Sequence, residues 1–319
     1  MDLDRRALIA AGLAVTATAG AQPRPAAAAS ARFPIWPGRP PGSPATPVVD
    51  AVVRRSVDGP ADDIAWPHVG TPMLTVTPAA RPTGAAVLLV PGGGYTRVAV
   101  GRNGSAIAAW FAARGVTAFD LLYRLPHDGW AAGPDAPLQD AQRAMRLIRS
   151  QAARWRIDPV RVAALGFSAG GHLAARLAAR SALATYAPID AADGLSTRPI
   201  VAGLLYPVVT LTEPFAHGGS RKELFAGTPS PADLRRLSTD QDLPADMPPT
   251  FLAHAADDRV VKVDNSLLLH AALRRANVPA EMILYERGGH GFGLKRADGI
   301  AFTWPEQFVG WANTHGLGA

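Results

Sequence analysis

From residue 85 onward, apolar runs alternate with amphipathic stretches of helical length, and this alternation constrains the fold most strongly. Strands are expected at 85–90, 116–123, 160–167, 201–206, 250–255 and 281–285. Helices are expected at 105–114, 138–155, 169–180, 265–276 and around 305–314. Strands that are apolar throughout and are separated by helices form parallel sheets covered on both faces. We therefore predict an α/β fold with a doubly wound, mostly parallel sheet and helices on both faces.

The first 30 residues have the order of an export signal. Arg5 and Arg6 precede a weakly apolar stretch, and small residues suited to signal-peptidase cleavage follow near Ala19 or Ala21. The apolar stretch is shorter than the ~20 residues that a membrane span needs. We expect residues 1–30 to be a twin-arginine export signal of a periplasmic or secreted protein. A frayed helix or a membrane anchor is the alternative.

The rest of the chain divides into two expected regions. Eight prolines between residues 22 and 47 predict a linker without regular structure, so 31–60 is interpreted as a Pro-rich N-terminal segment. The main domain is expected at 61–319, and it is interrupted at about 207–249 by a stretch rich in Gly, Pro and charge, with short helices near 220–225 and 231–237. Such an insertion is typical of a lid, a binding loop or a disordered segment.

Composition narrows the class of protein. The chain has 319 residues, is 48% hydrophobic and has no cysteine, so a large core without disulfides must stabilise it. The net charge of +6 is spread over isolated arginines, without the basic stripe that nucleic-acid binding requires. We expect no nucleic-acid partner and no membrane span, and the oligomeric state is not predicted.

Ser168 lies in the pattern Gly-x-Ser-x-Gly, directly between a predicted strand and a predicted helix. In a parallel sheet this turn faces the carboxyl edge, where ligands bind. The glycines at 166 and 170 suit a corner so tight that side chains would clash there. An alternative is that Ser168 only caps the helix.

A serine nucleophile needs a histidine base and a carboxylate behind it. His290 follows the last predicted strand on a glycine-rich loop. Asp257 and Asp258 follow the strand before it, and one of them is expected to orient the imidazole. At the end of the first predicted strand, the amides of Gly93 and Gly94, together with that of Ala169, are candidate donors to an oxyanion.

The order PGGGY, GFSAGG, HAADD and GGHGFG resembles the α/β-hydrolase superfamily, and within it the acetylxylan-esterase-like and feruloyl-esterase-like branch related to dienelactone hydrolases and prolyl oligopeptidases. The resemblance covers roughly residues 84–312. It implies Ser168 as nucleophile, His290 as base and Asp258, four residues beyond His254, as the triad carboxylate. It also implies that the PGGG at 91–94 is the oxyanion loop.

The resemblance predicts a serine carboxylesterase acting on short-chain esters, with acetylated plant polysaccharide as the expected substrate class. A prolyl-oligopeptidase-type peptidase and a non-catalytic carbohydrate-binding homologue are the alternatives. No metal and no cofactor is expected, and the partner is a small-molecule or oligosaccharide ester. Tyr95, His217 and Phe292 are candidate substrate-binding walls. His172 is expected to pack beneath the site.

Overall fold

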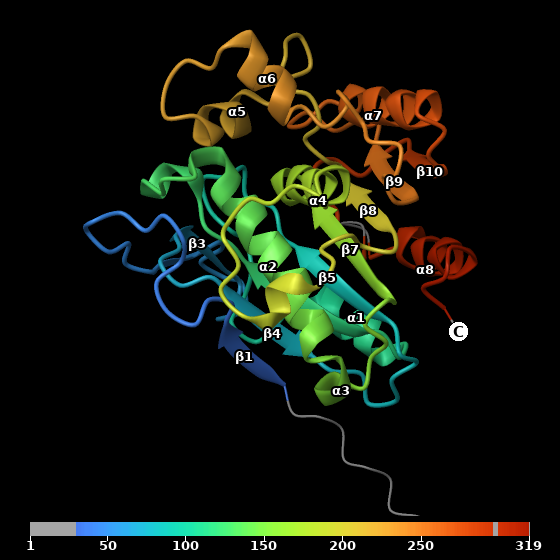
Figure 1. The fold of residues 1–319 in the computed structure, drawn as a ribbon. Helices are drawn as coiled ribbons and strands as arrows, with labels where there is room; N and C mark the ends of the chain where they lie inside the picture. Colours follow the sequence, from blue (N-terminus) through green and yellow to red (C-terminus); the bar gives the residue numbers. More distant parts are fainter. Residues whose placement is uncertain (1–29, 296–298, 319) are drawn as a thin grey trace, which may run out of the picture.

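The fold was analysed in a computed structural model, which describes residues 30–295 and 299–318. Its main element is an eight-stranded sheet (Figure 1). The strands in spatial order are β1 (Ala31–Pro34), β4 (Met73–Thr77), β6 (Thr117–Leu122), β5 (Ala86–Val90), β7 (Val162–Phe167), β8 (Ala202–Leu205), β9 (Thr250–Ala255) and β10 (Ala280–Tyr285). From β6 to β10 all neighbours are parallel, whereas β4 is antiparallel to both β6 and β1.

Helices cover both faces of this sheet. The helices of the described residues are α1 (Ala106–Ala113), α2 (Ala136–Ser150), α3 (Ala152–Trp155), α4 (Ala169–Ala179), α5 (Gly218–Leu224), α6 (Pro231–Leu237), α7 (Asp264–Arg275) and α8 (Trp304–Thr314). Three 3₁₀ turns are η1 (Pro126–Asp128), η2 (Gly133–Asp135) and η3 (Ala191–Gly194). The prediction of a doubly wound, mostly parallel α/β fold is confirmed.

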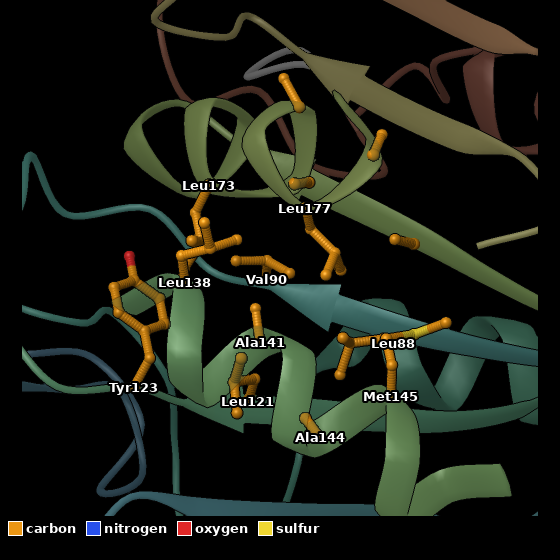
Figure 2. Packing of buried hydrophobic residues seen from close by; sticks show 14 of the residues in the cluster. Leu88, Val90, Leu121, Tyr123, Leu138, Ala141, Ala144, Met145, Leu173 and Leu177 are labelled. Carbon is orange, nitrogen blue, oxygen red and sulfur yellow. The ribbon is translucent and has the colours of Figure 1, made fainter. Parts of the chain in front are cut away.

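Alternate residues of the central strand β5 serve two separate cores. Leu88 and Val90 pack with α2 and α4 on one face, and Figure 2 shows Val90 near Leu138 and Leu173, and Leu88 near Met145. Val87 and Leu89 pack with α1 and α8 on the other face. Because both sets are fully or almost fully buried, the strand reads as unbroken apolar sequence.

The N-terminal region differs from the prediction. The linker expected at 22–47 to lack regular structure contains β1, which pairs with β4 along Ala31–Pro34. A second small sheet joins β2 (Ala51–Arg54) to β3 (Ile64–His68). The expected 138–155 helix is two helices that meet at Gln151. The expected signal at 1–30 lies outside the described residues, apart from its last residue.

The 207–249 insertion is folded rather than open. It contributes α5 and α6, which lie together at the top of the view in Figure 1, and its apolar residues Leu211, Leu224 and Leu237 are buried in the main core. Throughout 30–295 and 299–318, no helix has the length and apolar character to cross a membrane.

Candidate active site

Ser168 lies at the sharp turn from β7 into α4, with φ 55° and ψ −121°. This backbone is held by three hydrogen bonds: the Ser168 N–H donates to Leu205 O (3.0 Å), and the Ser168 carbonyl accepts from His172 and Val208 N–H (3.1 Å each). A β-carbon at residue 170 would overlap the carbonyl oxygens of Val90 and Pro91. The corner therefore needs glycine there, and the strained turn directs the serine side chain away from the sheet and toward His290.

The structure brings Ser168, His290 and Asp258 into one hydrogen-bonded chain. His290 Nε2 lies 2.8 Å from Ser168 Oγ, and His290 Nδ1 lies 2.7 Å from Asp258 Oδ2. An ionised carboxylate only accepts, so the Nδ1 position carries the proton. Nε2 is then left with a lone pair directed at the serine hydroxyl, which is the arrangement that activates a hydroxyl as a nucleophile.

Hydrogen bonds to Asp258 favour its ionised form. Its Oδ1 accepts from the N–H groups of Val260 (2.8 Å) and Val261 (3.0 Å). Burial acts to raise the pKa of Asp258, but the hydrogen bonds from His254 and His290 outweigh burial, and the pKa lies below its usual value. The carboxylate thus stays ionised and fixes the proton of His290 on Nδ1.

The loop after β5 lies against the nucleophilic serine. A β-carbon added at Gly92 would lie 3.1 Å from Ser168 Cβ, so this loop touches the nucleophile. Among the residues that the structure describes, we find no acceptor for the N–H groups of Gly93, Gly94 and Ala169. Their assignment as oxyanion donors remains a prediction that this arrangement suits.

With this geometry defined, comparison with known proteins identifies the family. The BD-FAE family profile matches residues 75–196. The crystal structure of the acetyl ester-xyloside bifunctional hydrolase from Caldicellulosiruptor lactoaceticus is 32% identical, with a TM-score of 0.71, and the alignment covers 91% of this chain and 97% of that one. The chain belongs to the α/β-hydrolase superfamily, in its acetylxylan-esterase-like branch.

Two curated relatives of this α/β hydrolase are longer proteins. The acetylxylan esterase of Xylanibacter ruminicola is 32% identical over 233 residues, which are 72% of this chain and 44% of that protein. The endo-1,4-beta-xylanase B of Butyrivibrio fibrisolvens is 32% identical over 226 residues, 71% of this chain and 34% of that protein. The chain thus spans less than half the length of the curated relatives that it matches.

Tyr95 is not a pocket wall, contrary to the prediction. Its backbone has φ 61°, which turns the side chain into the core, where it is fully buried. Its hydroxyl lies 2.8 Å from His172 Nδ1. His172 Nε2 lies 2.7 Å from the carbonyl of Leu237 and must donate to it, so His172 Nδ1 accepts from Tyr95. Burial lowers the pKa of His172 to about 3, and this histidine packs beneath the site as expected.

Phe292 and His217 are the other two predicted pocket walls, and they differ in their relation to the base, His290. Phe292 is buried among aromatic rings, 4.6 Å from the Tyr206 centroid, and Tyr206 in turn lies 5.0 Å from the His290 ring. Phe292 therefore supports the base through Tyr206 and is not an open wall. His217 caps α5, and burial and the nearby His290 lower its pKa. It lies close to the triad, so a substrate-binding role remains a prediction.

His254 and Asp257 position the triad, a role that the sequence does not predict for either of them. His254, fully buried on β9, directs Nε2 at Asp258 Oδ2 (3.2 Å) while its Nδ1 contacts Ser266 Oγ (2.7 Å). Asp257 accepts from the N–H groups of Gly288 (2.9 Å) and Gly289 (2.8 Å) and so holds the loop that carries the base. A histidine inside an otherwise apolar strand was the available signal for the first of them.

Proposed function

We propose that the chain is a serine carboxylesterase that hydrolyses short-chain esters through an acyl-enzyme, and that it deacetylates xylan-type plant polysaccharide. The observation that carries this proposal is the hydrogen-bonded chain from Ser168 through His290 to Asp258. The names of the relatives, an acetylxylan esterase and an acetyl ester-xyloside hydrolase, support the substrate class.

The reaction follows from the positions of the protons. Ser168 Oγ attacks the ester carbonyl carbon as its proton passes to His290 Nε2, 2.8 Å away. Asp258 stabilises the resulting imidazolium, and the N–H groups of Gly93, Gly94 and Ala169 stabilise the oxyanion. The tetrahedral intermediate collapses, the alcohol leaves with the proton from Nε2, and an acyl-serine forms. Water, deprotonated by His290, then attacks the acyl-serine, and as this second tetrahedral intermediate collapses His290 returns the proton to Ser168 Oγ, which releases the acid and the free serine.

The insertion at 207–249 supports a preference for short acyl groups. A lipase needs a contiguous apolar flap over a long acyl channel. Here Leu211, Leu224 and Leu237 are buried, while α6 directs Arg235 and Arg236 toward solvent. None of the large apolar side chains exposed on the described surface belongs to this insertion. The rim of the site is therefore polar and does not suit a long hydrocarbon chain.

A series of nitrophenyl esters tests the proposed activity. We expect kcat/KM to fall at least about tenfold between butyrate and decanoate, because no apolar flap covers the extra methylenes. Acetate release from acetylated xylan should be measurable, and a peptide amide run alongside should not be cleaved. Faster turnover of decanoate than of acetate, or a jump in activity above the solubility limit, would indicate a lipase instead.

We also propose that the protein is exported through a twin-arginine pathway and acts in the periplasm or outside the cell. Arg5 and Arg6, followed by weakly apolar and then small residues, support this proposal. Changing both arginines to lysine (R5K with R6K) is expected to leave the protein in the cytoplasmic fraction of its host, as measured by immunoblotting after fractionation. Unchanged export of the double variant would exclude the twin-arginine route.

A further inference from the structure

A second group of chemically active side chains lies on elements that do not carry the triad. His68 ends β3, and His127 and Asp128 belong to η1. One ligand atom from each of these residues lies within 4.8 Å of the other two. Glu223, on α5 in the insertion, reaches the same place, with its Oε2 3.2 Å from His127 Nδ1. We call these four residues the His68 cluster.

The ligand atoms of His68, His127 and Asp128 are close enough to share one ion after a small adjustment of His68. Bonds of 2.0–2.1 Å in tetrahedral geometry place neighbouring zinc ligands about 3.3 Å apart. His127 Nε2 lies 3.6 Å from Asp128 Oδ1, and His68 Nδ1 lies 2.7 Å from the same oxygen. The His68 side chain is half exposed, so a small rotation widens the shorter gap and leaves an open path for an ion.

The side chain of Asp128 is buried and fixed within the His68 cluster. Its side chain is only 2% exposed, and its Oδ2 accepts from the backbone N–H of Val69 at 3.1 Å. The second oxygen, Oδ1, is thereby aimed at the two imidazoles. A buried carboxylate with one oxygen fixed and the other directed at two ring nitrogens is a prepared oxygen ligand rather than a solvated surface charge.

Both ring nitrogens of His127 face hydrogen-bond acceptors. Nε2 faces the Pro67 carbonyl (3.0 Å) and Asp128, whereas Nδ1 faces the Glu223 carboxylate. A neutral imidazole has one N–H and cannot satisfy both sides. With the proton on Nδ1 and donated to Glu223, the lone pair of Nε2 can bind a cation once the ring turns away from the Pro67 carbonyl that Nε2 contacts in this structure. A carboxylate behind a metal-binding histidine is the usual way to fix that tautomer.

We propose that the His68 cluster binds one divalent transition-metal ion of the zinc class. His68 Nδ1, His127 Nε2 and Asp128 Oδ1 are the ligands, water completes the shell, and Glu223 is a positioning residue. Two imidazoles and one carboxylate are the donor set that Zn²⁺ favours. The ion would join β3 and η1 to α5, whose cap residue His217 lies near the base His290. The proposal does not depend on the esterase activity.

Direct titration tests the site. Tag-free full-length protein, stripped with a chelator, is titrated with Zn²⁺ in competition with a chromophoric chelator. We expect one saturable equivalent, with affinity reduced at least about 100-fold in His68→Ala and in His127→Ala and about 10–100-fold in Glu223→Gln. His270→Ala, on the far element α7, is the matched control and should bind as the parent does. Bound Co²⁺ should show the intense visible absorption of a four-coordinate ion.

The same titration can overturn the proposal. Absence of a saturable equivalent in the parent protein, or His68→Ala binding as tightly as the parent, would exclude the site. Equal weakening in His270→Ala would show adventitious surface binding instead. Because His68 is half exposed, its variant should keep the parent's circular dichroism spectrum, so a loss of binding reports on the ligand and not on unfolding.

Discussion

Ser168→Ala is expected to lower kcat for ester hydrolysis by about 10⁴–10⁶-fold. Ser168 Oγ supplies the new bond to the acyl carbon, and the described contact of this atom is to His290 Nε2 at 2.8 Å. Alanine tolerates the positive φ of residue 168 no worse than serine does, so the fold should be unchanged. Steady-state kinetics, together with circular dichroism and a melting curve, check both parts of this expectation.

A covalent probe gives an independent control for the nucleophile. A fluorophosphonate should label the parent protein at Ser168 alone and should not label Ser168→Ala. A folded alanine variant that still hydrolyses esters at the parent's rate would show that the proposed mechanism is wrong.

Asp258→Asn is expected to lower kcat by about 10⁴-fold. An asparagine in this place presents a neutral amide to His290 and His254, so the proton of His290 is no longer fixed on Nδ1 and the imidazolium is no longer stabilised. The kcat of the purified variant on nitrophenyl acetate measures the loss.

Asp257→Asn is the matched control, because it makes the same chemical change at the neighbouring residue. Asp257 accepts only from the N–H groups of Gly288 and Gly289 among its described contacts, and an asparagine carbonyl can accept there too. We expect a loss of less than about tenfold, in line with removal of one charge from a hydrogen bond. The opposite ranking of the two variants would place the triad carboxylate at Asp257.

The sequence predicted the central part of the fold well and its border poorly. Strands β5 to β9 are buried throughout, so each appears as a mainly apolar run, with Asp120 in β6 and His254 in β9 as the charged or titratable exceptions. In contrast, β1 contains Arg32 and ends at Pro34, and its identity depends on pairing with β4, which no local pattern encodes. A proline lacks a backbone N–H donor, so a region rich in proline is expected to be irregular. At the end of an edge strand, however, a proline is tolerated, and β1 can therefore form.

In the site too, the sequence predicts residues that lie in recognisable motifs and does not predict roles that depend on tertiary contacts. Ser168 and His290 are marked by the glycines that their turns require, and Asp258 by its distance from His254. Tyr95 follows a glycine loop at the sheet edge, which suggests exposure, yet its φ of 61° directs the ring inward. The pairing of His254 with Ser266 arises only when α7 folds against β9, so the sequence marks His254 as an unusual residue for an apolar strand but does not show what it contacts.

The pairing of β1 with β4 also limits how far the N-terminus can be shortened. Four residues from Ala31 cover the outer side of β4. A cut beyond them would leave the backbone groups of β4 open along that side, and an open strand of this kind recruits strands from other molecules. Maturation by a peptidase, or a truncation made for expression, should therefore stop before Ala31 if the protein is to remain free of aggregates.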